Sequence, residues 1–157
     1  MTSTEKPDTE APTMGKTFHI TIPGNPVPKG RPRFVKRGKF FAVYTPTKTR
    51  DAEATIAGSV FHKWKLPPMD GPLALYIEFF LDRPRCHFRT GKYSRVLSQH
   101  AMGAPTSKPD LDNLAKLVMD GLNACQIWTD DAQVVHLEAH KAYDHENPRT
   151  EIYIEEL

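Results

Sequence analysis

Cysteines and long apolar runs are scarce in this 157-residue chain. The two cysteines, Cys86 and Cys125, lie too far apart in sequence to form the close pairs of metal-binding motifs. They suit a reducing, cytoplasmic protein. The longest apolar run, Leu73–Leu81, is interrupted by Glu78 and is too short to span a bilayer. We therefore expect neither disulfides nor a membrane span.

Apolar side chains are also rare in residues 1–16, which carry three acidic residues and no hydrophobic core. This composition predicts a disordered tail and no signal peptide. The remaining residues, 17–157, suffice for one domain with its own hydrophobic core.

Several motifs of common enzymes are missing. Neither GxGxxG nor GxxxxGK[ST] occurs, so we expect no organic cofactor. The seven histidines are scattered, and His136 and His140 have no cysteine or glutamate partner at ligand spacing, which argues against zinc. No Ser–His or Cys–His pair is singled out.

Acidic residues are absent from two long stretches, residues 23–50 and 83–109, which hold eight and six of the 21 basic residues. One such block is often only a solvated face. Two blocks on either side of a carboxylate cluster favour a polyanionic partner, above all DNA. The candidate DNA-binding residues are Lys29, Arg31, Arg33, Lys36, Arg37, Arg83, Arg85, Arg89, Lys92 and Lys108.

Hydrophobic periodicity predicts an α+β single domain, with a mixed β-sheet and two main helices. The irregular segment 82–107 has no period, and a loop of that length is usually functional or mobile. The expected elements are a strand at 18–22, a hairpin at 34–44, a helix from about 46 to 64, a strand at 73–81, a helix at 111–123, and strands at 134–143 and 151–155.

Four aspartates surround the second predicted helix, in the stretch KPDLDNLAKLVMDGLNACQIWTDD. Asp110 and Asp112 stand at the helix start, and Asp130 and Asp131 stand where the chain re-enters the sheet. If the topology brings the start of this strand to the start of the helix, three carboxylates meet. Such oxygen ligands suit Mg²⁺ or Mn²⁺.

Structural roles also explain these residues. An aspartate at a helix start is most often a cap, and the TDD sequence could cap a turn. Asp112, Lys116 and Asp120 have the i, i+4 spacing of a solvated helix face. Trp128 could be a core residue or a stacking platform. Spacing alone leaves the metal site and these structural roles open.

The motifs D-L-D-N-L-x-K, a tryptophan, and D-D-x-Q-V-V closely resemble the signature of RusA-type Holliday junction resolvases. A looser similarity runs from about Phe18 to the C-terminus. It includes the proline-rich loop PGNPVPKGRPRF, whereas segment 82–107 is longer than in the shorter members.

The resemblance implies a homodimeric hydrolase that uses Mg²⁺ or Mn²⁺ to nick two opposed strands of a four-way DNA junction in recombination and repair. It also implies a phage or prophage origin and action in the cytoplasm of a bacterial host. By the same resemblance the catalytic residues are Asp110, Asp112, Asp131 and Lys116, with Asp130 beside them as a metal ligand.

Two rival functions remain. One is a non-catalytic protein that binds branched DNA; the complete set of aspartates and lysine argues against it. The other is a restriction-type nuclease, because Pro109-Asp110 mimics the start of the PD…(D/E)xK pattern. No D-x-K or E-x-K follows between residues 120 and 141, which argues against this second rival.

Overall fold

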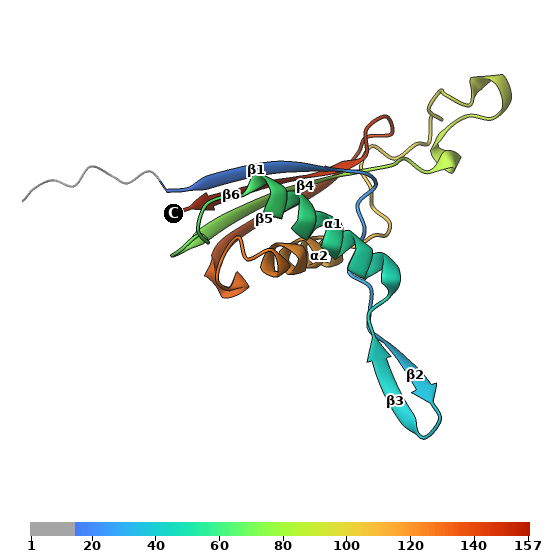
Figure 1. Cartoon of the computed structure of the whole chain (residues 1–157). Coiled ribbons are helices and arrows are strands. Elements are labelled where there is room, and N and C mark those ends of the chain that lie inside the picture. The colour runs from blue at the N-terminus through green and yellow to red at the C-terminus, as the bar shows by residue number, and fades with distance from the viewer. Residues whose placement is uncertain (1–14) are drawn as a thin grey trace, which may run out of the picture.

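The computed structural model of the chain describes residues 15–157 (Figure 1). The predicted tail, residues 1–16, therefore lies almost wholly outside the described part. The described residues form a mixed four-stranded sheet, a separate two-stranded hairpin and two α-helices. This confirms the predicted α+β fold with two main helices.

The sheet has the strand order β1-β6-β4-β5, and its strands reproduce the predicted ones closely. Only β4 and β5 are parallel; the other pairs are antiparallel. A parallel pair needs a crossover connection, which here contains the irregular segment and the second helix. The strands are β1 (Thr17–Pro23), β4 (Leu73–Leu81), β5 (Val134–Tyr143) and β6 (Arg149–Glu156).

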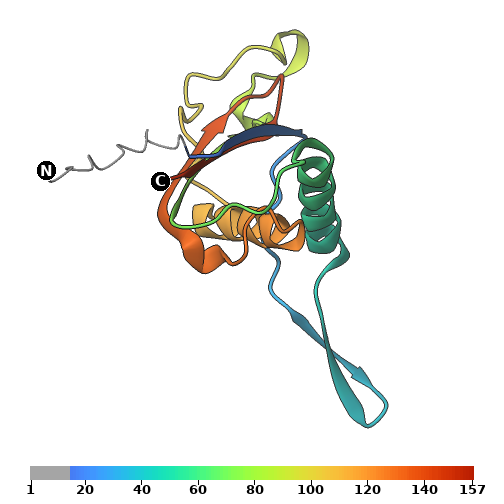
Figure 2. The ribbon, with the colours of Figure 1, turned by 60° about the vertical axis from the view of Figure 1, so that its left-hand side comes forward.

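The helices α1 (Thr47–Lys63) and α2 (Leu111–Ala124) cover one face of this sheet (Figure 2). The predicted apolar stripe of α2 is buried, as its i, i+3, i+4 spacing requires. The two helices approach closely at Gly121, where an added Cβ would lie 3.0 Å from the Ile56 side chain. The buried stripe consists of Leu114, Leu117, Val118 and Leu122.

The hairpin of β2 (Arg33–Arg37) and β3 (Phe40–Tyr44) projects away from the sheet and helices (Figures 1 and 2). All its strand residues are exposed; Phe34 and Phe40 are 75% and 80% exposed. Because these aromatic rings are exposed, they are available to a partner. A lone two-stranded hairpin is only marginally stable in water.

Segment 82–107 is irregular, as predicted, and contains two short 3₁₀ turns, Arg85–His87 and Gly91–Tyr93. Arg83 links this segment to the sheet. Its guanidinium lies 4.4 Å from the centroid of the Tyr143 ring, and its Nη1 donates a hydrogen bond to the carbonyl of Met102 at 2.7 Å.

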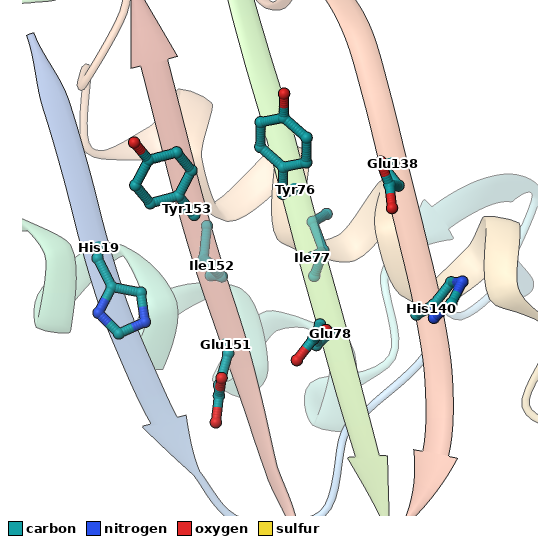
Figure 3. Close-up of a pocket in the computed structure, with 9 residues that line it drawn as sticks. All are labelled: His19, Tyr76, Ile77, Glu78, Glu138, His140, Glu151, Ile152 and Tyr153. Carbon is teal, nitrogen blue, oxygen red and sulfur yellow. The ribbon is translucent and has the colours of Figure 1, made fainter.

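The sheet face opposite the helices is open and polar (Figure 3). It carries a shallow hollow of about 250 Å³. Tyrosines, histidines and glutamates line it, and the Tyr76 and Tyr153 ring centroids are 5.8 Å apart. No helix in the described part of the chain is long and apolar enough to cross a membrane.

Glu156 is the last residue of β6, and its carboxylate is expected to make the stability of the fold depend on pH in the acidic range. Its carboxylate accepts hydrogen bonds from the backbone N–H groups of Lys16 at 3.0 Å and Asp70 at 2.7 Å, and these bonds lower the pKa of Glu156. A lowered carboxyl pKa stabilises the fold above the ordinary value near 4.5. That contribution disappears as the pH falls through the folded-state pKa.

Glu156→Gln should therefore lower the melting temperature by roughly 4 °C at pH 7, since a weaker neutral acceptor replaces the carboxylate. The difference from the unmodified chain should shrink at pH 3. Glu155→Gln is the control, because Glu155 accepts no side-chain hydrogen bond among residues 15–157. Thermal unfolding at both pH values checks this, and equal losses at pH 7 and pH 3 would contradict it.

Candidate active site

Asp110 and Asp112 stand at the N-terminal end of α2. Asp110 occupies the N-cap position with extended backbone, but its side chain makes no capping hydrogen bond. Among residues 15–157 the Asp110 side chain accepts only a long hydrogen bond, 3.5 Å, from the Asn113 side-chain amide. Asp112 is exposed in the first helical turn, where the positive end of the helix dipole favours carboxylates. The capping alternative therefore does not account for Asp110.

Lys141, which the sequence patterns did not single out, holds the chain that leads to Asp110. Its Nζ donates hydrogen bonds to the carbonyls of Ser107 at 2.9 Å and Pro109 at 3.0 Å. Lys141 lies near the end of β5, so these bonds attach the loop before α2 to the sheet. In the sequence, the only indication of this role is that a lysine occupies the helix-facing side of an alternating strand.

A basic cleft of about 690 Å³ opens beside Asp110. Arg31 and Lys48 come from the first acid-free block, and Lys108 comes from the second. The two blocks, far apart in sequence, thus meet at the start of α2. The cleft is lined by Asn25, Pro26, Pro28, Lys29, Arg31, Lys48, Lys108, Pro109, Asp110 and Asn113.

Lys29 lies at the inner edge of this cleft but is already paired. Its Nζ forms ion pairs with Glu53 of α1 and with Asp120 of α2, the latter at 2.6 Å. Partial burial disfavours the charged amine, but hydrogen bonds to Asp120 and Glu53 outweigh burial and raise the pKa of Lys29. The backbone N–H of Lys29 also donates to the carbonyl of Asn113 at 2.9 Å. Lys29 therefore fastens the proline-rich loop to both helices.

Asp130 begins the short 3₁₀ turn that leads into β5. Its carboxylate accepts a hydrogen bond from the Ala132 N–H at 2.7 Å, and the Gln133 side chain returns to the Asp130 N–H at 3.0 Å. These reciprocal bonds form a capping box. The turn-capping alternative is thus confirmed for Asp130, whose Oδ2 keeps no hydrogen bond within residues 15–157.

Asp131 is held differently. Its Oδ2 accepts a hydrogen bond from the Asn123 side-chain Nδ2 at 3.1 Å, and the Asn123 side-chain Oδ1 accepts one from the Trp128 indole N–H. Trp128 is 1% exposed, which confirms its role in the core. Asn123 was also missed from the sequence, because an asparagine near a helix end has no distinctive signal.

These contacts place Asp131 at the opposite end of α2 from Asp110. A helix of 14 residues is roughly 20 Å long. The direction of β5 also separates the two aspartates. This strand starts just after Asp131, and its contact with the loop before Asp110 is made by Lys141, near its other end. The start of the strand and the start of the helix therefore do not meet within one chain.

No group of three or more His, Cys, Asp or Glu side chains within residues 15–157 is arranged to hold a metal. The open sheet face, despite its glutamates and histidines, likewise offers no such group among these residues. Lys116 is exposed on α2, one turn after Asp112, and makes no ion pair within the described residues. In one chain Asp112 and Lys116 therefore lie one turn apart on α2, whereas Asp131 lies at the far end of this helix.

The sequence of this chain matches a known protein family over the residues of the candidate site. The pattern of the family described as "Endodeoxyribonuclease RusA" matches residues 23–155, which include the basic cleft and both ends of α2. The chain belongs to the RusA endodeoxyribonuclease family. This confirms the resemblance carried by the aspartate motifs.

Two relatives of this chain differ in how much of its sequence they match. The chain is 31% identical over 138 residues to the uncharacterized protein YqaN of Bacillus subtilis strain 168, which covers 88% of this chain and 95% of YqaN. It is 48% identical over 52 residues to the crossover junction endodeoxyribonuclease rusA of Lactococcus phage r1t. That second match covers 33% of this chain and 39% of the phage protein.

RusA family nucleases are generally metal-dependent, and the donor chemistry here suits a hard cation. Asp110 and Asp112 offer carboxylate oxygens on exposed positions beside a basic cleft, and Asp131 offers a third carboxylate. Within one chain Asp131 cannot share an ion with Asp110 and Asp112, because it lies at the other end of α2.

Proposed function

We propose that this protein is a homodimeric, metal-dependent endonuclease that resolves four-way and other branched DNA junctions by paired, symmetric nicks. Its role would be in recombination and repair, in the cytoplasm of a bacterial host carrying a phage or prophage. The chemistry would need Mg²⁺ or Mn²⁺ and no organic cofactor. Asp110, Asp112, Asp131 and Lys116 are the proposed catalytic residues, with the free oxygen of Asp130 as an additional ligand.

One observation carries this proposal: the two basic blocks converge on the exposed Asp110 carboxylate, and the exposed Asp112 follows two residues later on α2. A cleft rich in Arg and Lys attracts the phosphate backbone, yet carboxylates at its edge would repel it. A cation bound by Asp110 and Asp112 removes that conflict. The same arrangement brings a phosphodiester next to the groups that would cut it.

The proposed residues divide the chemistry as follows. A bound Mg²⁺ or Mn²⁺ would supply an activated water and neutralise charge on the phosphate. Lys116, one turn from Asp112 and free of ion pairs within residues 15–157, would donate hydrogen bonds to a non-bridging phosphate oxygen as negative charge accumulates there. Asn123 would hold the Asp131 carboxylate in one orientation.

The projecting hairpin is the second proposed DNA contact. Lys36 and Arg37 lie near its tip, where they pair with the exposed Phe41 and Phe40 of the other strand. Basic residues combined with aromatic rings suit DNA whose bases are partly unstacked, as at a branch point. We keep Arg33, Arg83, Arg85, Arg89 and Lys92 as further candidates for phosphate contact on the arms.

The test is cleavage of a synthetic four-way junction by the purified full chain. The proposal predicts nicks at matched positions in two opposed strands with Mg²⁺ or Mn²⁺, and none with a chelator. A linear duplex of the same sequence should remain uncut. Tight junction binding without cleavage under every metal condition would support the alternative, a non-catalytic branched-DNA-binding protein.

The salt dependence of binding tests whether the cleft contacts DNA. Arg31→Gln combined with Lys108→Gln should weaken junction binding and flatten the slope of log affinity against log salt by about 0.9 for each phosphate that is no longer neutralised. The control, Lys63→Gln with Lys65→Gln, removes the same charge at the end of α1. Fluorescence anisotropy from 50 to 200 mM salt, roughly the range in which such contacts weaken, checks this. Equal slopes in both double variants would contradict contact at the cleft.

A further inference from the structure

The β2–β3 hairpin combines exposed aromatic rings with positive charge. Phe41 is 73% exposed, like its exposed neighbours Phe34 and Phe40, and residues 33–44 contain no acidic residue. Clustered apolar side chains that remain in contact with water commonly mark a binding surface. The hairpin also carries the basic residues Arg33, Lys36, Arg37 and Lys39. This surface therefore suits a partner that has negative charge and flat apolar faces, as the phosphates and bases of DNA do.

The strand register places the two rings nearest the tip on opposite faces of the hairpin. Residues directly opposite each other in an antiparallel pair share a face, and successive residues of one strand alternate between faces. Phe41 lies opposite Lys36, and Phe40 lies opposite Arg37. Each face of the tip thus carries one phenylalanine beside one cation.

The turn keeps this end of the hairpin narrow. Only Gly38 and Lys39 connect the two strands. Gly38 has a φ of +63°, which glycine adopts readily and which suits a two-residue hairpin turn. Because only a glycine and one lysine lie beyond the rings, the tip is slim enough to enter between separated bases.

The base of the hairpin is fixed at the rim of the basic cleft, and the arm extends from the start of α1 (Figures 1 and 2). Arg31 before β2 and Lys48 after β3 both line the cleft. The backbone N–H of Gly30 donates a hydrogen bond to Oγ1 of Thr49 at 3.0 Å, which ties the two ends of the arm together. A strand of five residues spans roughly 17 Å. The tip therefore stands about five stacked base pairs from the cleft.

We infer that this hairpin is a wedge that recognises the branch point of a DNA junction. Phe40 and Phe41 would stack on bases exposed there, while Lys36 and Arg37 neutralise the flanking phosphates. In a continuous duplex the same insertion must first separate stacked base pairs, whereas strand exchange at a branch point already weakens the stacking. The wedge thus gives a preference for branched DNA. This inference rests on the proposed function for its DNA substrate.

Two double variants of the hairpin form a matched pair. Phe40→Leu with Phe41→Leu removes the two rings at the tip. Phe34→Leu with Tyr44→Leu removes two rings at the root, again one from each face. Both variants keep every charge and replace each ring by an apolar side chain. All four rings are exposed, so we expect both melting temperatures to stay unchanged.

The tip variant should lose about tenfold to hundredfold in the ratio of junction affinity to duplex affinity, which is the usual effect of losing stacked aromatic rings. Its duplex affinity should not change, because the basic residues remain. The root variant should keep the wild-type ratio. Phe40→Trp with Phe41→Trp should keep it too, because an indole ring also stacks on bases. Fluorescence anisotropy with a chelator present, so that no strand is cut, measures these affinities.

The fluorescence of 2-aminopurine reports unstacking directly. Placed at the branch point, this base should brighten when the wild-type chain or the root variant binds, and should stay near its free-junction level with the tip variant. Placed in the middle of a duplex arm, it should not respond. No brightening with the wild-type chain would overturn the wedge, as would equal losses of selectivity in the tip and root variants. A lower mass in light scattering for the tip variant alone, with wild-type brightening, would show that the tip contacts another copy instead.

These readouts separate the wedge from the proposed function, because none of them requires cleavage. A chain that unstacks the branch point but never nicks it with Mg²⁺ or Mn²⁺ would sustain the wedge and defeat the proposed nuclease. Junction nicking by the wild-type chain without unstacking would overturn the wedge alone. Equal affinity of the wild-type chain for junction and duplex would defeat both.

Discussion

Asp112→Asn is expected to abolish junction nicking, with a loss of several orders of magnitude, while leaving junction binding intact or slightly tighter. The substitution keeps the shape of the side chain but removes one charge and one strong metal ligand. Asp112 lies in the first turn of α2, so a purely structural role would lose only its interaction with the helix dipole, about 1 kcal/mol at most, and predicts near-normal activity. Junction binding and nicking, measured on the same folded sample, distinguish the two.

Stability gives an independent check of Asp112→Asn. Removing one of the two carboxylates at the start of α2 should leave the metal-free melting temperature unchanged or higher, because Asp110 and Asp112 repel each other. The stabilisation conferred by added Mn²⁺ should shrink, because ligand-induced stabilisation depends on affinity for the folded state. Asp120→Asn is the matched control on the same helix, and its effect on nicking should be milder because Asp120 pairs with Lys29. Near-normal nicking by Asp112→Asn would refute the proposed chemistry.

Asn123→Ala is expected to lower nicking by about tenfold to hundredfold, the usual cost of losing a residue that orients a metal ligand. Its amide is the hydrogen-bond donor that fixes Asp131, at 3.1 Å. The substitution also leaves the buried Trp128 indole N–H without its acceptor, so some stability should be lost as well.

Trp128→Phe separates these two effects. It removes the indole N–H but leaves the Asn123–Asp131 hydrogen bond in place. We expect both variants to lose stability, whereas only Asn123→Ala should lose most of its nicking at a temperature where both are folded. Melting curves and nicking rates measured together check this, and equal nicking losses would show that Asn123 acts through packing alone.

Much of the fold could be predicted from local pattern. Segment 73–81 is apolar at nearly every position, and the strand observed there, β4, is an inner strand with neighbours on both sides. The stripe of Leu114, Leu117 and Leu122 specifies a helix because its spacing fits one buried face. These signals are local, so they are visible without knowing what the segment packs against.

The site was harder to predict because its geometry depends on topology. The sequence placed Asp131 where the chain re-enters the sheet, which is correct, but not which end of α2 that entry lies beside. Parallel pairing of β4 and β5 makes β5 start at the far end of the helix from Asp110. Long-range partners such as Lys29 and Asp120 were likewise invisible, because no local pattern links residues separated by most of a domain.

A supercoiled plasmid carrying an extruded cruciform provides the most direct test of the central claim. Paired nicking of opposed strands within one bound complex converts this substrate to linear DNA without a build-up of open circles. The account predicts linear product with Mg²⁺ or Mn²⁺, none with a chelator, and none from the Asp112→Asn chain. Intact plasmid in every metal condition, or open circles as the only product, would contradict it.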